Sequence, residues 1–230
     1  MQLGLRAVLL LFAFVAAPSA IRGQDEPQRK PDPVPSQQYQ PKPTGVNPLT
    51  GLGMVSSVDY RPLTGDERWK LYYKQNFTSL GAAVAVVIPA GMDHLYKQPP
   101  EWGSHNDALG KRLASRFGTA VIQGTTQAAA CAALGQDPRY IRSSSSGWLR
   151  RAGHAALFSV LTYNNEGKRR FALGTVGSYY ASSMATTLWF PGRYTALGDG
   201  VRDGNRQIAL SALVNEVQEF WPEIRRIFRR

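Results

Sequence analysis

His154 is the histidine whose neighbours could do chemistry, because Arg150 and Arg151 precede it by one helical turn. Two guanidinium groups can hold a phosphate through charge-assisted hydrogen bonds, and an imidazole beside them can serve as a general acid or base. The spacing predicts a candidate catalytic centre for phosphate hydrolysis, if a carboxylate such as Asp137 or Glu216 orients the imidazole in a concave pocket. The alternative is a structural histidine that hydrogen-bonds only to backbone.

Other enzyme signatures are missing from the sequence. His94 and His105 lack metal-ligand spacing with another His, Cys or carboxylate. The chain also lacks a nucleophile elbow, a P-loop, a dinucleotide fingerprint and a paired-cysteine metal site. The sequence therefore predicts no metal and no cofactor, and it favours a non-enzymatic function.

The first 23 residues have the pattern of a secretory signal peptide. Arg6 precedes an apolar run, Ala7–Ala17, which has the length of a signal-peptide core and is too short to cross a bilayer. Cleavage after Gly23 would leave Gln24 as the first residue. We therefore expect an exported protein of the periplasm or cell envelope, in which the lone Cys131 has no intramolecular partner and is buried and inert. An intermolecular bridge or a reactive thiol is the alternative for Cys131.

The formal net charge is +11, and basic residues concentrate between Gln136 and Arg170. This stretch carries seven basic and two acidic side chains, which predicts a surface for anionic lipid or glycan. A solvated surface that keeps the protein soluble is the alternative. Nucleic acid is not expected as a partner, because aromatic and basic platforms that would bind it are lacking. The predicted ligand-binding residues are Arg139, Arg142, Arg150, Arg151, Lys168, Arg169 and Arg170.

A proline-rich stretch separates the signal peptide from the rest of the chain. Eight of the 15 prolines lie between Gln24 and Pro62. Proline fixes φ and removes a backbone donor, so we expect a disordered tether without helix or sheet ladders. The predicted organisation is a signal peptide at 1–23, the tether at 24–63 and one helical domain at 64–230.

The domain is predicted to be all-α, a single bundle of about five helices. Thr64 or Asp66 can cap the first helix, which must kink or end at Pro89. Asp137-Pro138 has the pattern of a new helix start, and Pro222 should interrupt the last helix. The predicted helical stretches are 67–92, 110–134, 147–163, 171–192 and 210–228, with strands as the alternative for 171–192 and a turn at 164–167.

Small residues at four-residue spacing indicate close helix packing, because they let backbones approach. Burial among other helices is one interpretation, and a membrane-embedded helix is the other, since residues 117–136 carry no charge. In 210–228, apolar residues recur at three- and four-residue steps, which predicts an amphipathic helix with Asn215 and Glu219 away from the apolar stripe. The small-residue sets are Gly110, Ala114 and Gly118; Gly124, Ala128 and Ala132; and Gly174, Ser178, Ser182 and Thr186.

Several short strings resemble those of uncharacterised exported bacterial proteins. The resemblance covers about residues 67–224 and implies a helical domain as the unit and a variable tether, with no activity, substrate or site. The strings are Glu101-Trp102-Gly103, Lys111-Arg112, Arg116-Phe117-Gly118, Asp137-Pro138-Arg139-Tyr140, Gly153-His154-Ala155 and Glu219-Phe220-Trp221-Pro222.

These patterns favour an exported, envelope-associated structural or binding protein whose arginine-rich loops contact an anionic membrane surface or glycan. The rival hypothesis is a hydrolase that acts on a phosphorylated envelope component with His154, Arg150 and Arg151. A further class is a homo-oligomer, a self-assembling helical pore, which would need the small-residue faces to be exposed in the monomer.

Overall fold

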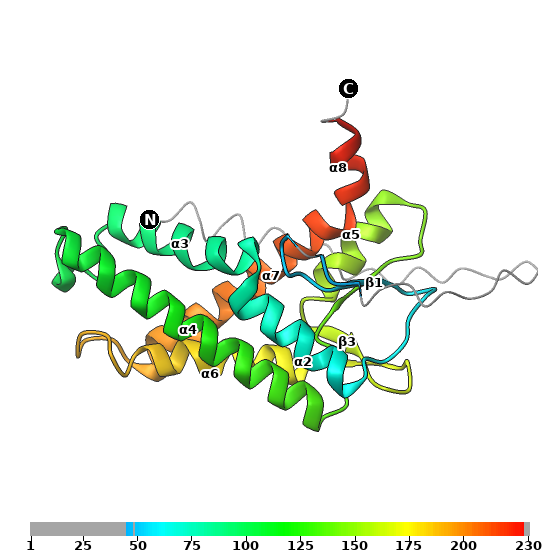
Figure 1. Cartoon of the computed structure of the whole chain (residues 1–230), viewed down its shortest axis with the longest axis horizontal. Coiled ribbons are helices and arrows are strands. Elements are labelled where there is room, and N and C mark those ends of the chain that lie inside the picture. Colours follow the sequence, from blue (N-terminus) through cyan, green and yellow to red (C-terminus); the bar gives the residue numbers. More distant parts are fainter. Residues whose placement is uncertain (1–44, 48, 228–230) are drawn as a thin grey trace, which may run out of the picture. The chain divides into compact units, whose positions relative to one another are not determined.

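The computed structural model describes residues 45–47 and 49–227, and this part of the chain is mostly helical (Figure 1). The predicted helical class is confirmed in this general sense. The predicted signal peptide and most of the predicted tether lie outside the described residues. The seven α-helices are α2 (Gly65–Tyr73), α3 (Leu80–Leu95), α4 (Asn106–Ala133), α5 (Trp148–Leu157), α6 (Leu173–Thr186), α7 (Val201–Glu219) and α8 (Trp221–Ile227). Three one-turn helices are η1 (Lys74–Thr78), η2 (Pro100–Trp102) and η3 (Ala196–Gly200).

Two small sheets were not predicted. Strand β1 (Met54–Ser56) pairs in parallel with β2 (Tyr140–Arg142), and β3 (Leu161–Tyr163) pairs antiparallel with β4 (Arg169–Phe171). The prediction of a ladder-free tether is wrong for β1, because no proline lies between Pro48 and Pro62 and the backbone donors there are available. The third predicted helix is wrong beyond Leu157, because the chain turns into the β3–β4 hairpin. The segment 173–186 is helical, as the small-residue period indicated.

Helix α2 begins as predicted, but the bend that follows it lies elsewhere. Thr64 and Glu67 form a capping box at the start of α2. Pro89 lies inside α3, and the 44° bend occurs where Ser79 leaves helical geometry and accepts a hydrogen bond from the Ala82 amide at 3.0 Å. The prediction that the helix ends at Pro89 is therefore wrong, since α3 continues to Leu95 and the break lies at a new N-cap ten residues before the proline.

The segment after α4 is also not a helix. Gly135 has φ of +60°, a left-handed conformation that ends α4 and that glycine adopts readily. Asp137 does not cap a helix. Its carboxylate instead accepts hydrogen bonds from the backbone and side chain of Arg139, and the chain continues as β2. Pro222 lies in the first turn of α8, after the break at Phe220, so the predicted restart is confirmed.

The helices pack in the order α3, α4, α6, α7 and α5, with the closest association between α4 and α6 (Figure 1). On α6, Ser178 and Ser182 are fully buried, and a Cβ on Gly174 would lie 2.9 Å from the Cys131 amide nitrogen. The predicted small-residue face of α6 is therefore confirmed as a packing face. On α4 the prediction is wrong at Gly110, Ala114 and Ala132, which are exposed. Helix α4 instead buries Ala108, Arg112, Ser115 and Cys131.

Cys131 lies at the α4–α6 contact. Its thiol is fully buried and lies 3.8 Å from the Thr175 hydroxyl. Burial raises the pKa of this thiol to about 11. A thiol held protonated in this way is a poor nucleophile.

Helix α7 buries the face that was predicted to be polar surface. Gly204, Asn215 and Glu219 are buried. Leu213 and Val217 are more than half exposed, as is Leu210 at 59%. The apolar stripe of this helix therefore faces solvent for much of its length, and the side of Asn215 and Glu219 faces the core. The buried polar residues have partners, since Asn215 donates to the Ala155 carbonyl.

Among the described residues, no single helix has the length and apolar character needed to cross a membrane. One bent pair, residues 65–78 with α3, meets those criteria when its two halves are taken together.

We predict that Gly174→Ala destabilises the protein by about 1–3 kcal/mol, because the added methyl group must displace α4 backbone. Urea denaturation would measure the change. The matched control is Gly177→Ala in the same helix, which meets no atom within 4 Å and should stabilise by about 0.5–1 kcal/mol. If both substitutions changed stability in the same direction, the close α4–α6 approach would be contradicted.

Candidate functional site

An open pocket of about 370 Å³ lies beside α5 and is lined by basic and hydroxyl side chains. This volume lies within the range of small-molecule sites in proteins. No acidic side chain is among the residues that line it. They are Ser57, Ser143, Ser144, Ser145, Arg150, Gly153, His154, Leu157, Phe158, Leu161 and Arg169, and we call this cavity the basic pocket.

The helical period of α5 determines which arginine reaches the basic pocket. Arg150, His154 and Leu157 recur at three- and four-residue steps and lie on the pocket side of α5. Arg151 is rotated by about 100° from Arg150 and faces α7, where it contacts Glu219. The two neighbouring arginines that were predicted to act together therefore have different environments.

His154 lines the basic pocket and has one ring nitrogen that is buried. Its ring stacks on Phe158 at a centroid distance of 4.0 Å, and its Nδ1 has no hydrogen-bond partner. Burial lowers the pKa of His154. The charge of Arg169 lowers this pKa further, whereas the charge of Glu219 raises it. A neutral imidazole can donate or accept one hydrogen bond at a ligand in the pocket.

The carboxylate that a hydrolase would need does not contact His154. Asp137 is bonded to Arg139, and no hydrogen bond or ion pair within the described residues joins Glu216 to His154. Burial, with a smaller contribution from Glu219, raises the pKa of Glu216. The geometry of this pocket therefore suits the binding of an anion better than proton transfer to and from it.

Glu219, on α7, connects two of the segments that line the basic pocket, α5 and the loop at 143–146, to each other. This fully buried carboxylate accepts hydrogen bonds from the Tyr140 hydroxyl at 2.7 Å, the Ser143 amide at 3.1 Å and Arg151 Nε at 2.8 Å. Because these donors come from β2, the serine-rich loop and α5, one side chain of α7 fixes all three. The pKa of the Tyr140 phenol is raised by burial and by Glu219.

Arg151 completes this buried cluster. Its Nη1 donates to Glu223 at 2.6 Å, and its guanidinium lies 4.5 Å from the centre of the Phe220 ring. Both carboxylates raise the pKa of Arg151. Arg151 is thus occupied by internal contacts.

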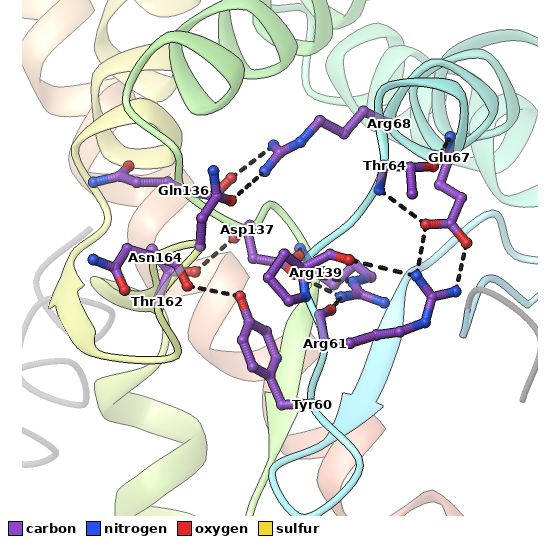
Figure 2. A network of polar contacts seen from close by, with 12 residues as sticks. Tyr60, Arg61, Thr64, Glu67, Arg68, Gln136, Asp137, Arg139, Thr162 and Asn164 are labelled. Atoms are coloured by element: carbon purple, nitrogen blue, oxygen red, sulfur yellow. Dashed lines mark hydrogen bonds and ion pairs between the residues drawn. The ribbon is translucent and has the colours of Figure 1, made fainter. Parts of the chain in front are cut away.

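A second polar network joins the chain before α2 to the turn after α4, as Figure 2 shows. Arg139 Nη2 donates to Asp137 at 2.6 Å and to the Arg61 carbonyl at 2.7 Å. Arg61 pairs in turn with Glu67, and Arg68 donates to the Gln136 carbonyl. The Arg139 side chain is only 2% exposed, so it stabilises the fold and is not accessible to a ligand.

The remaining predicted ligand residues differ in their exposure. Arg142 lies 3.8 Å from Glu219 and is mostly buried. Lys168 pairs with Glu166 at the surface, and Arg170 is exposed. Of the predicted set, the structure places Arg150, Arg169 and the candidate His154 together in the basic pocket.

Sequence reasoning missed two parts of this site. The Ser143–Ser145 run has the composition of a connecting loop, and nothing in it signals a pocket wall. Ser57 comes from the stretch that was assigned to the tether. The buried Glu219 was placed away from the apolar stripe of its helix, and nothing near it in the sequence indicates that its partner is Arg151 on α5.

Within the described residues, no group of three His, Cys, Asp or Glu side chains is arranged to hold a metal ion. No family model matches the chain, and no curated protein or solved structure is significantly similar to it.

We predict that Glu219→Ala destabilises the protein by about 3–5 kcal/mol, because Arg151 and Tyr140 lose a buried partner. Chemical denaturation would measure this loss. Glu223→Ala is the matched control, since Glu223 pairs with the same arginine but is 45% exposed, and should cost about 0–1 kcal/mol. Equal effects would show that Glu219 does not organise the cluster.

Glu67 should make folding stability depend on pH in acid. Its hydrogen bond from Arg61 lowers its pKa from 4.5 to about 2. Because the folded-state pKa is the lower one, ionised Glu67 stabilises the fold above pH 4.5, and this contribution disappears as the pH falls through about 2. Glu67→Gln should therefore be less stable than the parent protein at pH 6, with a difference that shrinks at pH 2–3. A difference independent of pH would contradict the assignment. Glu166→Gln, at an exposed ion pair, controls for the loss of a surface carboxylate.

Proposed function

We propose that this protein is an exported, envelope-associated binding protein that holds a phosphate-bearing group of a lipid or glycan in the basic pocket. The helical domain acts as one packed unit at the end of the proline-rich tether. Arg150 and Arg169 supply the positive charge, and the serine hydroxyls and His154 supply hydrogen bonds.

One observation carries the proposal: two arginines that have no ion-pair partner within the described part of the chain line a cavity that has no acidic lining residue. Arg150 is exposed in the basic pocket, and Arg169 approaches it from β4. Two other arginines of the same stretch, Arg139 and Arg151, are satisfied by internal carboxylates. Arg150 and Arg169 thus differ from them in being available to a ligand at the pocket.

Unsatisfied polar atoms in the pocket support an anionic, hydrogen-bonding ligand. His154 Nδ1 and Ser57 Oγ are both buried and accept or donate no hydrogen bond within the described residues. A buried donor or acceptor without a partner costs about 1–3 kcal/mol. A phosphate oxygen or hydroxyl that reached these atoms would recover this energy, which favours a ligand with several oxygens.

The hydrolase remains the second candidate, because His154 and Arg150 share the pocket. Neither Asp137 nor Glu216 contacts the His154 imidazole, so the pocket lacks the orienting carboxylate that this hydrolase would need. Export and the envelope location rest on the apolar run at 7–17 and its basic flank.

We predict that Arg150→Ala and Arg169→Ala each weaken binding of glycerol 3-phosphate and glucose 1-phosphate by about tenfold or more, because each removes a charge-assisted hydrogen bond. Isothermal titration calorimetry with the mature chain would measure both ligands. The ratio of the two dissociation constants distinguishes a lipid headgroup, represented by glycerol 3-phosphate, from a glycan phosphate, represented by glucose 1-phosphate.

Arg170→Ala is the matched control, because neighbouring strand residues point to opposite faces and Arg170 does not line the pocket. Its affinity should stay within about twofold of the parent value, since it loses only long-range charge. If Arg170→Ala lost as much affinity as Arg169→Ala, binding would depend on overall positive charge and not on the basic pocket. If the parent protein released inorganic phosphate from these ligands and His154→Asn did not, the hydrolase would be the correct function and the binding proposal would be wrong.

A further inference from the structure

Helix α3 presents a continuous apolar stripe to solvent. Its large apolar side chains at three- and four-residue steps are between 43% and 74% exposed. The main contacts of α3 are with α4 and η1, so the opposite side is uncovered in the described part of the chain (Figure 1). The stripe consists of Leu80, Val84, Val87, Ile88, Met92 and Leu95.

Single exposed apolar residues are common on proteins, but a stripe without polar interruptions marks an interaction surface. The exposed small residues between its members, Ala83, Ala85 and Gly91, are apolar as well. Residues 77–92 carry no charge. An amphipathic surface helix has its polar side in contact with solvent, whereas residues 80–92 of α3 do not form a polar side.

The charged groups of α3 are directed toward α4. Asp93, the one acidic residue of α3, accepts hydrogen bonds from Arg116 Nε at 2.6 Å and Nη2 at 2.8 Å. His94 lies 3.2 Å from the buried Arg112 guanidinium. The acidic residue is therefore neutralised within the protein and does not repel an anionic surface.

The two ends of the stripe carry the residues that are found at a membrane interface. Tyr73, Phe77 and Lys74 precede it, and Tyr96 and Lys97 follow it. All five are exposed. Aromatic rings lie at headgroup depth, and lysines there contact lipid phosphates.

From these observations we propose that α3 lies in the interfacial region of an anionic lipid bilayer, with its apolar stripe among the acyl chains and Lys74 and Lys97 at the phosphates. A helix of 16 residues is about 24 Å long, which is shorter than the roughly 30 Å hydrocarbon core. We therefore place α3 parallel to the membrane surface. This surface is independent of the basic pocket.

A second copy of the chain fits the stripe less well. In a two-fold dimer with antiparallel α3 helices, Lys74 of one copy would approach Lys97 of the other. Like charges at both ends of the contact would oppose association. Anionic lipid instead neutralises both lysines, and the formal charge of +11 acts in the same direction.

Vesicle flotation of the mature chain tests the proposal, with vesicles of equal parts phosphatidylcholine and phosphatidylglycerol and with pure phosphatidylcholine. The parent protein should float with the anionic vesicles, and Val87→Asp/Ile88→Asp should lower the bound fraction by about tenfold or more. The matched control is Leu213→Asp/Val217→Asp on the exposed stripe of α7, which should bind within about twofold of the parent. Circular dichroism would verify that both variants fold, and Val87→Ser/Ile88→Ser gives a milder test of the same face.

Three results would overturn the proposal: no flotation of the parent protein, an equal loss in both aspartate variants, or a dimer by light scattering that Val87→Asp/Ile88→Asp converts to a monomer. The last result would assign the stripe to a second copy. The pocket proposal is tested by calorimetry with soluble phosphates and the bilayer proposal by flotation of Val87→Asp/Ile88→Asp, so failure of one and failure of the other are distinguishable.

Discussion

A single buried carboxylate constrains the half of the domain that contains the pocket. Glu219 is fully buried, and its desolvation is offset only because three donors from separate segments reach it. Each donor can satisfy the carboxylate in one position only, so β2, the serine-rich loop and α5 are held relative to α7. Two of these segments, the serine-rich loop and α5, also line the basic pocket, whereas Glu219 is not one of its lining residues.

Internal pairing also determines how the positive charge of the chain is used. The stretch 136–170 was predicted to present seven basic side chains to a ligand. Asp137 binds Arg139, and Glu219 and Glu223 bind Arg151, which removes two arginines from that surface. The number of basic residues in a sequence therefore overestimates the positive charge that a ligand meets. Which side of the helix an arginine lies on decides whether its charge is available, as Arg150 and Arg151 show.

Much of the fold could be predicted from local signals. The Thr64 capping box, the left-handed Gly135, the restart at Pro222 and the small-residue face of α6 follow from geometry within a few residues. The orientations of α4 and α7 could not be predicted in this way. Both helices bury polar residues, Arg112 and Glu219, whose partners lie far away or in loops. A periodicity argument assumes that polar faces are solvated, so it assigned these two helices the wrong buried face.

The pocket was accessible to sequence reasoning only in part. His154 and Arg150 share one helical face, which the sequence shows directly. Arg169 and Ser57 join them through the β3–β4 hairpin and the segment after β1, and both of these depend on strand pairings between short segments with weak sequence signals. The proposed membrane face of α3 was visible as a charge-free run, but its one-sided exposure requires knowledge of what α4 covers.

The position of Cys131 gives the chain an internal reporter of helix separation. It is the single cysteine of the sequence, and its thiol lies between α4 and α6 with its pKa raised to about 11. An alkylating reagent can reach it only after these two helices move apart, so the labelling rate measures how often that contact opens. In an oxidising compartment the same packing acts as chemical protection: the folded state, rather than a second cysteine, keeps the thiol from forming crosslinks.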